Sequence, residues 1–242
     1  MVEAMTDMNG QIIQGYRLSV LSADSTDDGH PNVYSATQTN DLSKAVVKFA
    51  PSALPETAIL TLTKGPVFPD LYASGQHGDA FFAIMQNFDG GSLLNRIASG
   101  IKIQSVISAI RQIALALDEL HRIGYVHGDV KPEHIVFTQN GLPGLIDYGC
   151  AIPIGETATN INPDRPAAQL SPGYASPEQI TGRSLDGRSD IYSLGIVFYQ
   201  VLTGHLPYTD PDTQTMLQKH VQEPIPRLPN HLASLQPVID LL

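Results

Sequence analysis

Residues 125–137 read YVHGDVKPEHIVF and place an aspartate, a lysine and two histidines in one short polar run between apolar segments. The segment before it, residues 103–121, has apolar side chains at helical spacing. Gly124 can end that helix, because glycine accepts the left-handed backbone found just past helix ends. The pattern therefore predicts a buried helix that leads into a polar loop.

A hairpin is predicted directly after this loop. The apolar residues 135–137 are followed by Asn140-Gly141 and then by a second apolar run that ends at Asp147. An Asn-Gly pair between short apolar runs is a strong hairpin signal. Asp129 and Lys131 are thus expected on the loop and Asp147 at the far end of the hairpin. Two carboxylates and a lysine that converge in this way suit the binding of phosphate and metal.

At these residues a family becomes visible. The loop resembles the protein kinase catalytic loop H-R-D-L-K-P-E-N, and Asp147-Tyr148-Gly149 resembles the metal-binding D-F-G. Residues 45–48 are similar to the V-A-I-K strand, residues 173–178 to the segment that ends in A-P-E, and residues 190–195 to the start of the helix that anchors the large lobe. With these motifs in the family's order, the chain is identified as a member of the eukaryotic-like (Hanks-type) serine/threonine protein kinases.

The resemblance implies an α+β, bilobal protein-kinase-like fold with a small antiparallel-sheet N-lobe and a mainly helical C-lobe. We expect a loose leader over residues 1–10, the N-lobe over residues 11–88 and the C-lobe over residues 89–242. The C-lobe is expected to be incomplete, because in the family the glutamate matched by Glu178 pairs with an arginine that would lie beyond Leu242.

Local patterns predict the main elements of both lobes. A helix starting near Glu56 is expected to be capped by Ser52, with Pro55 in its first turn and Gly65-Pro66 at its end. Ser92 is expected to cap a helix after the lobe connector. Strands are expected at residues 16–21, 32–37, 45–49 and 81–85, and further helices at residues 191–202, 213–221 and from 235 onward.

The resemblance assigns one set of residues to ATP. Lys48 would hold the inner phosphates and pair with Glu56, and backbone groups near Gln86 to Phe88 would face adenine. Without the resemblance, Lys48 would read as an exposed lysine at the end of an edge strand, and Glu56 as an acid that favours a helix N-terminus. The assigned ATP-binding residues are Lys48, Glu56, Val33, Val46, Met85, Gln86, Phe88, Val136 and Ile146.

Catalysis is assigned to three residues and metal binding to two. Asp129 would orient the substrate hydroxyl, and Lys131 would stabilise the transferring phosphate. Ser171 matches the position of the hydroxyl that bonds both of them in serine/threonine kinases. Asp147 would chelate the metal, and His134 occupies the position of a metal-binding asparagine. The cofactors implied are ATP and Mg²⁺, with Mn²⁺ as the alternative.

Three positions depart from the family pattern. Residues 22–31 contain one glycine and three aspartates where a glycine-rich phosphate loop is expected, so an acidic surface loop without phosphate contact is the competing interpretation. Gly128 replaces the arginine that reads a phosphorylated activation loop. His134 either ligates the metal through its imidazole, which suits softer ions than Mg²⁺, or only hydrogen-bonds the loop backbone.

Three functions therefore compete. The favoured one is an ATP-dependent serine/threonine protein kinase, because Lys48, Asp129, Lys131 and Asp147 are all present. The second is a pseudokinase that acts as a nucleotide-binding or scaffolding module. The third is a small-molecule kinase of the aminoglycoside phosphotransferase type, whose H-G-D and I-D motifs resemble residues 127–129 and 144–147. Residues 131–133 and 174–178 disfavour it, because they fit the peptide-binding lobe of a protein kinase.

Composition limits the partners and the compartment. The net charge of −10 argues against nucleic acid as a partner. Cys150 is the only cysteine, so no internal disulfide can form, which fits a reducing compartment. No apolar run reaches the length needed to cross a bilayer, which is about 20 residues. We therefore expect a cytoplasmic protein that binds ATP and a protein substrate; the sequence gives no indication of an oligomeric state.

Overall fold

The computed structural model describes residues 8–20, 32–100, 102–157 and 171–241. The chain divides into two compact units. The first comprises Met1–Lys64 and Pro69–Phe88, and the second comprises Gly65–Phe68 and Asp89–Leu242. Among the described helices, none is both long and apolar enough to cross a membrane.

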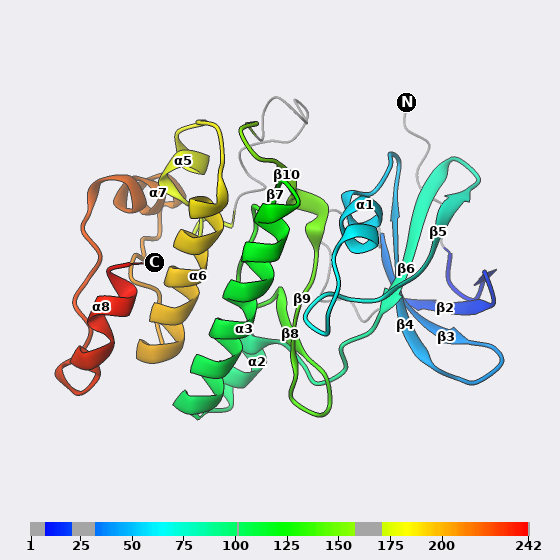
Figure 1. The fold of residues 1–242 in the computed structure, drawn as a ribbon, viewed down its shortest axis with the longest axis horizontal. Helices are drawn as coiled ribbons and strands as arrows, with labels where there is room; N and C mark the ends of the chain where they lie inside the picture. The colour runs from blue at the N-terminus through cyan, green and yellow to red at the C-terminus, as the bar shows by residue number, and fades with distance from the viewer. Residues whose placement is uncertain (1–7, 21–31, 101, 158–170, 242) are drawn as a thin grey trace. The chain divides into compact units, whose positions relative to one another are not determined.

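The first unit is built on one antiparallel sheet with the order β1-β2-β3-β4-β6-β5. Strands that are neighbours in sequence pair with each other, except that β4 pairs with β6 and not with β5. Figure 1 shows these strands in colours from blue to turquoise. Their bounds are β1 Ile12–Ile13, β2 Tyr16–Val20, β3 Val33–Gln38, β4 Lys44–Ala50, β5 Leu71–His77 and β6 Ala80–Gln86.

Side-chain alternation gives this sheet one apolar core face. Tyr34 on β3 and Phe49 on β4 are fully buried and pack edge to face, with ring centroids 5.8 Å apart. Met8 joins the same cluster and is 8% exposed. Its backbone N–H donates to the Tyr34 hydroxyl at 3.2 Å, and the Gly10 N–H donates to the Leu18 carbonyl at 2.9 Å. The expected loose leader is therefore wrong for residues 8–10, while residues 1–7 lie outside the described part of the chain.

The helix α1 runs from Pro55 to Leu62. Its N-cap residue is Leu54, which has no capping side chain, so the predicted Ser52 cap is wrong. Proline at the first position supplies a fixed helical φ and lacks an N–H that would need a partner. The helix ends before Thr63, whose hydroxyl and N–H both donate to the Ile59 carbonyl.

Gly65–Phe68 belongs to the second unit, although this segment was expected in the N-lobe. The Leu145 N–H donates to the Val67 carbonyl at 2.8 Å. The Phe68 ring also stacks on Tyr148, with centroids 6.4 Å apart. These contacts fix the segment beside the hairpin that carries the polar loop.

The second unit is mainly helical, and α3 packs along α6 (Figure 1). The α-helices among its described residues are α2 Leu93–Ala98, α3 Ile103–Arg122, α5 Pro177–Ile180, α6 Gly187–Thr203, α7 Thr213–Gln222 and α8 Gln236–Ile239. Its 3₁₀ helices are η1 Tyr148–Cys150 and η3 Asn230–Leu235. Two small antiparallel sheets pair β7 Tyr125–Val126 with β10 Ile152–Pro153 and β8 Ile135–Phe137 with β9 Pro143–Leu145.

Most of these helices lie where the sequence predicts them. α3 is followed by Gly124 at φ 92°, and α6 ends at Gly204 at φ 81°, both in the left-handed region that favours glycine. Ser92 caps α2 through a capping box with Asn95, as predicted for this serine. The helix expected from Leu235 onward is shorter, because a 3₁₀ turn precedes the single turn of α8. A sheet unit followed by a helical unit confirms the predicted α+β class.

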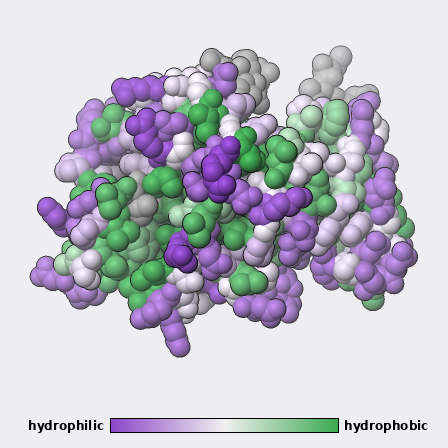
Figure 2. Space-filling view, in the orientation of Figure 1, coloured by the Kyte–Doolittle hydropathy of each residue, from purple (hydrophilic) through white to green (hydrophobic). Residues whose placement is uncertain are grey.

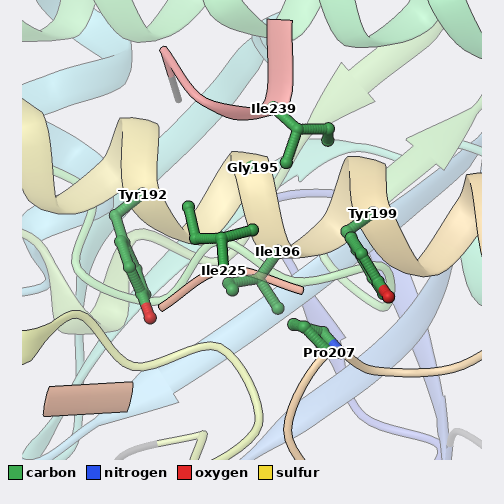
Figure 3. Close-up of a pocket in the computed structure, with 7 residues that line it drawn as sticks. All are labelled: Tyr192, Gly195, Ile196, Tyr199, Pro207, Ile225 and Ile239. Atoms are coloured by element: carbon green, nitrogen blue, oxygen red, sulfur yellow. The ribbon is translucent and has the colours of Figure 1, made fainter. Parts of the chain in front are cut away.

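Apolar side chains of the helical unit are visible between polar ones in Figure 2. Exposed members include Leu115 on α3 and Val238 on α8. Beside α6 lies a small apolar pocket (Figure 3). It is lined by Tyr192, Gly195, Ile196, Tyr199, Pro207, Ile225 and Ile239. Its lining contains no carboxylate, imidazole, amine or thiol, so we do not regard it as a catalytic site.

A buried histidine makes the stability of the helical unit sensitive to acid. His220 on α7 is 4% exposed; its Nδ1 lies 2.8 Å from the Tyr192 hydroxyl, and its ring packs against Tyr208. Burial lowers the pKa of His220 from 6.5 to about 4, against an opposing effect of the Pro172 backbone. Between about pH 6.5 and pH 4 the unfolded chain binds a proton at His220 and the folded chain does not. The contribution of the neutral ring to stability is therefore complete above about pH 6.5 and is lost as the pH falls toward 4.

We therefore expect the melting temperature of the protein to fall more steeply between about pH 7 and pH 4.5 than that of His220→Phe. Both proteins in this comparison carry Tyr192→Phe, and only one of them also carries His220→Phe. The Tyr192 hydroxyl is then absent from both, so neither has a hydroxyl that lost its acceptor. Scanning calorimetry across this pH range provides the measurement. Parallel curves for the two proteins would show that His220 is not the titrating group.

Candidate active site

The polar loop lies between β7 and β8, as the sequence predicts. The turn of the following hairpin closes with the Gly141 N–H donating to the Thr138 carbonyl at 2.9 Å, and Gly141 has φ 81°. The hairpin pairs Ile135 with Leu145. Asp147 follows β9 with a left-handed backbone, φ 64°. The hairpin thereby brings Asp147 back beside the loop that precedes it in sequence.

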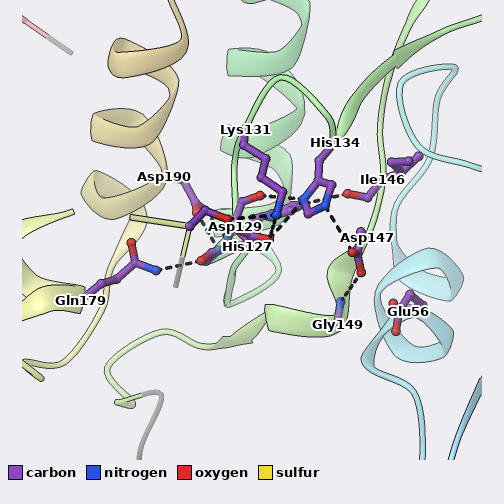
Figure 4. A network of polar contacts seen from close by, with 12 residues as sticks. Glu56, His127, Asp129, Lys131, His134, Ile146, Asp147, Gly149, Gln179 and Asp190 are labelled. Atoms are coloured by element: carbon purple, nitrogen blue, oxygen red, sulfur yellow. Dashed lines mark hydrogen bonds and ion pairs between the residues drawn. The ribbon is translucent and has the colours of Figure 1, made fainter. Parts of the chain in front are cut away.

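Asp129, Lys131 and Ser171 form a closed triangle of polar contacts. The Lys131 ammonium donates to Asp129 Oδ2 at 2.8 Å and to the Ser171 hydroxyl at 2.9 Å. The Ser171 hydroxyl donates to Asp129 Oδ1 at 2.6 Å. Figure 4 shows the lysine reaching across to the aspartate from the same loop. A small pocket adjoins the cluster and is lined by Gly128, Asp129, Val130, Ser171, Tyr174, Ala175, Gln179 and Ser193.

The Asp129 side chain is only 9% exposed, yet its surroundings favour the ionised form. Burial alone would raise the pKa of Asp129, but the neighbouring charges of His134 and Lys131 and the hydrogen bonds from Lys131 and Ser171 hold it below its usual value. An ionised, hydrogen-bonded carboxylate at the edge of a pocket is suited to accept a hydrogen bond from a hydroxyl group.

The backbone just before Asp129 is held by a buried carboxylate from α6. Asp190 is 1% exposed; its Oδ2 accepts the His127 N–H at 2.8 Å and its Oδ1 accepts the Gly128 N–H at 2.9 Å. His121 Nε2 on α3 lies 2.8 Å from Oδ2. Figure 4 shows Asp190 directed from its helix toward the loop. The motif signalled that α6 begins here, but nothing in local sequence indicated that its aspartate fixes the polar loop.

The buried His127 ring also helps to hold the backbone near Asp129. Its ring Nε2 lies 3.1 Å from the Ile146 carbonyl, so this nitrogen carries the proton, and Nδ1 accepts the Asp129 N–H at 3.3 Å. His127 is fully buried and its ring packs on Tyr148 at 5.1 Å. The residue therefore links the loop to the segment just before Asp147.

Gln179 is a second supporting residue that sequence reasoning missed. Its side-chain amide donates to the Gly128 carbonyl at 2.7 Å. Its Oε1 accepts the Ser176 N–H at 3.0 Å within the capping box of α5. A serine followed three residues later by glutamine signals such a box, but the long-range bond from α5 to the loop has no local signal.

Gly128, where the resemblance implies an arginine, has a backbone conformation that favours glycine. It has φ 76°, and an added Cβ would lie 2.9 Å from the Cys150 carbonyl oxygen. Gly141 has nearly the same φ, 81°, but open space around an added Cβ. The two glycines therefore separate the effect of backbone strain from the effect of a close contact.

We expect Gly128→Ala to lower the melting temperature more than Gly141→Ala does. Both substitutions place alanine in the left-handed region, at about 1–2 kcal/mol, and only the first also meets the Cys150 carbonyl. Gly128→Ala should additionally slow catalysis, because Gly128 directly precedes Asp129. Thermal melting and activity of both variants test this; equal melting temperatures would contradict the close contact.

His134 faces both carboxylates of the loop region. Its Nδ1 lies 2.8 Å from the Asp129 carbonyl oxygen, which confirms the predicted backbone bond. Its Nε2 lies 3.3 Å from Asp147 Oδ2 (Figure 4). Burial lowers the pKa of His134, with Lys131 and His127 acting in the same direction and Asp147 and Asp129 opposing. The described residues contain no group of three or more histidine, cysteine, aspartate or glutamate side chains arranged to hold a metal ion.

The first unit carries the predicted lysine and its partner. The Lys48 ammonium forms an ion pair with Glu56 Oε1. The Glu56 side chain is 1% exposed and lies in the first turn of α1, so it also meets the positive end of that helix. Its second oxygen, Oε2, has no hydrogen-bond partner among the described residues. The reading of Lys48 as an isolated surface lysine is therefore wrong.

Strand register places four of the assigned ATP-binding residues on one face of the sheet. Val33 lies opposite Lys48, and Val46 lies opposite Met85. Since Val46 and Lys48 are two residues apart on β4, all four side chains project from the same face, opposite to the apolar core. A lysine beside three half-buried apolar residues is compatible with a nucleotide that offers both phosphates and an aromatic base.

The other assigned ATP-binding residues have mixed positions. The Gln86 N–H donates to the Asp70 carbonyl at 2.8 Å, so this amide is not available to adenine, contrary to expectation. Phe88 is half-buried in the connector. In the second unit, Val136 on β8 is 7% exposed and Ile146, just before Asp147, is half-buried. The predicted phosphate loop, residues 22–31, lies outside the described residues.

Glu178 was expected to lack the arginine partner of the family, and it bonds a serine instead. The Ser189 hydroxyl donates to Glu178 Oε1 at 2.5 Å. Ser189 lies in the first turn of α6 and is 1% exposed. This bond ties α5 to the start of the helix that supplies Asp190.

A family model for the protein kinase domain matches residues 27–238. The chain belongs to the protein kinase family. The match covers most of the chain, including all the residues of the loop, the hairpin and the Lys48–Glu56 pair. The polar cluster around Asp129 and the Lys48–Glu56 pair therefore both lie within the matched kinase domain.

Similar proteins include several bacterial serine/threonine kinases. The kinase domain is 31% identical over 183 residues to serine/threonine-protein kinase PknB of Mycolicibacterium smegmatis, covering 72% of this chain and 29% of that protein. It is 30% identical over 177 residues to PknL of Mycobacterium tuberculosis, covering 71% and 43%. It is 37% identical over 158 residues to a probable serine/threonine-protein kinase of Clostridium acetobutylicum, covering 64% and 23%. The chain thus spans less than half of these relatives.

Proposed function

We propose that this kinase domain is catalytically active and transfers the γ-phosphoryl group of ATP to serine and threonine hydroxyls of proteins. The observation that carries the proposal is the triangle of Asp129, Lys131 and Ser171, with contacts of 2.6–2.9 Å. All three groups are charged or hydrogen-bonded as phosphoryl transfer requires, and the backbone that bears Asp129 is held by a buried carboxylate.

Each residue has a role that follows from its position. Asp129 accepts a hydrogen bond from the incoming hydroxyl and orients its oxygen; its lowered pKa keeps the acceptor ionised. Lys131 is held beside this carboxylate and neutralises charge on the phosphoryl group during transfer. Ser171 connects the two and fixes the start of the segment that leads to Tyr174. Positioning and charge neutralisation, rather than covalent catalysis, are what this reaction needs.

The residues also fit ATP and a divalent cation. Lys48 is oriented by Glu56 and shares a sheet face with Val33, Val46 and Met85. Asp147 is 40% exposed and offers a carboxylate near His134. A kinase site needs only one or two protein ligands for its cation, because phosphate and water supply the rest. The bound cation would neutralise phosphate charge; within the second unit, the protein's part is to hold Asp147 and Asp129 ready.

Ser171 favours a protein acceptor over a small molecule. Its bonds to both Asp129 and Lys131 extend the catalytic cluster into the segment 171–178, which in protein kinases receives the peptide. The relatives named above are serine/threonine kinases, which supports the same class of acceptor. A small-molecule kinase has no need of this connection.

The acceptor is tested by incubating the domain with radiolabelled ATP and either myelin basic protein or an aminoglycoside panel. We expect label on the protein, and acid hydrolysis should yield phosphoserine and phosphothreonine. Label on the aminoglycosides alone would replace the proposal with a small-molecule kinase. Nucleotide binding without label on any acceptor would replace it with a pseudokinase.

A further inference from the structure

The two ring nitrogens of His134 have distinct partners. Nδ1 lies 2.8 Å from the backbone carbonyl oxygen of Asp129, which can only accept a hydrogen bond. Nδ1 therefore carries a proton. Nε2 points the other way and lies 3.3 Å from Asp147 Oδ2, as Figure 4 shows. The tautomer is thus fixed by the loop backbone, and Nε2 is the nitrogen directed at the carboxylate.

This geometry matches that of metal-binding histidines. Such histidines almost always donate their second ring N–H to a carbonyl or carboxylate, which orients the ring and increases the basicity of the ligating nitrogen. With the proton on Nδ1, the lone pair of Nε2 faces the Asp147 carboxylate, and either a bound cation or a second proton on the ring turns this repulsion into attraction. The His134 side chain is 11% exposed and that of Asp147 is 40% exposed, so the pair opens on its carboxylate side.

We infer that His134 Nε2 and Asp147 form a mixed nitrogen–oxygen ligand pair for the divalent cation that accompanies the nucleotide, and that this domain prefers Mn²⁺ and other transition-metal ions to Mg²⁺. Mg²⁺ demands hard oxygen ligands and keeps its water. Imidazole favours first-row transition ions, and affinities along that series rise from Mn²⁺ toward Cu²⁺. The inference rests on the proposed nucleotide-binding function of the same site.

Nitrogen ligation is tested directly by pulsed electron paramagnetic resonance of Mn²⁺ bound to the domain with a non-hydrolysable ATP analogue. We expect a ¹⁴N coupling to the metal that changes to a ¹⁵N pattern when the protein is labelled with ¹⁵N-histidine. This readout needs neither turnover nor a substituted protein. Bound Mn²⁺ without a histidine coupling would overturn the inference, because a proton rather than the metal would then join His134 to Asp147.

His134→Asn supplies the second test, since its amide oxygen is a hard ligand that suits Mg²⁺. Even the loss of a group that only orients a metal ligand lowers metal affinity by about 10–100-fold. Because His134 is proposed as a direct ligand, we expect the ratio of Mn²⁺ to Mg²⁺ affinity to fall by at least about tenfold in this variant. His205→Asn is the matched control, because His205 is exposed and its ring lies against its own neighbour's carbonyl. An unchanged ratio in His134→Asn would contradict the inference.

Calorimetric titration with the ATP analogue separates this inference from the proposed function. Nucleotide binding together with an unchanged metal ratio and no nitrogen coupling rejects the role of His134 alone. Failure to bind the analogue with either Mg²⁺ or Mn²⁺ rejects the nucleotide site itself, and the metal preference with it.

Discussion

Asp129→Asn should reduce phosphotransfer by about 100–10,000-fold, the range expected when a positioned acid–base group is removed. The amide keeps the size of the side chain and can still accept a bond from Ser171. It loses the charge that attracts a substrate hydroxyl and that pairs with Lys131. We therefore expect catalysis to fall while the fold and nucleotide binding remain, which initial rates, thermal melting and calorimetry would measure together.

Asp210→Asn is the matched control for this substitution. Asp210 also forms an ion pair with a lysine, since its Oδ2 lies 3.0 Å from the Lys219 ammonium. This pair lies outside the site. Removing this partly exposed pair should leave the rate unchanged within error. A wild-type rate in Asp129→Asn would exclude the assigned role of this carboxylate.

Asp190→Asn should destabilise the helical unit far more than a substitution of an exposed aspartate on the same helix. The buried carboxylate accepts the backbone N–H groups of His127 and Gly128 and contacts the His121 ring. An amide cannot accept both N–H groups, and a hydrogen bond to a charged group is worth about 1.5–3 kcal/mol. A loss of about 3 kcal/mol corresponds to a decrease of about 6–12 °C in melting temperature for a domain of this size.

Asp186→Asn is the control at the same end of α6. Asp186 caps the helix by accepting the Arg188 N–H, and it pairs with the exposed Arg188 guanidinium. Asparagine caps helices about as well as aspartate, so the change should stay within about 0.5 kcal/mol. If both variants melted at the same temperature, the three contacts of Asp190 would not be a major source of stability.

Local sequence patterns predicted the parts of the site that are made by neighbouring residues. The loop with Asp129 and Lys131 follows from the helix before it and the Asn-Gly turn after it. The Lys48–Glu56 pair and the bonds of Ser171 followed from the family motifs, because local patterns alone do not show which distant residues meet. These predictions agree with the bonds formed by Lys48, Lys131 and Ser171.

The parts that were missed depend on contacts between distant segments. Asp190 and Gln179 reach the loop from more than 50 residues away in sequence, and only the folded chain shows these bonds. The Ser52 cap failed because α1 begins at Pro55 with no side-chain cap. The prediction of a loose leader was wrong for residues 8–10, because Met8 packs into the core of the sheet. One apolar residue beside polar neighbours gives no sign of such packing.

The central claim is that the cluster around Asp129 transfers phosphate repeatedly. Its most direct test is a time course of radiolabelled phosphate transfer from ATP to myelin basic protein, run with Mg²⁺ and with Mn²⁺ and normalised to the amount of enzyme. We predict that label on the substrate exceeds one phosphate per enzyme molecule and rises linearly with time. Nucleotide bound in full with no label above that of Asp129→Asn, in either metal, would contradict the claim.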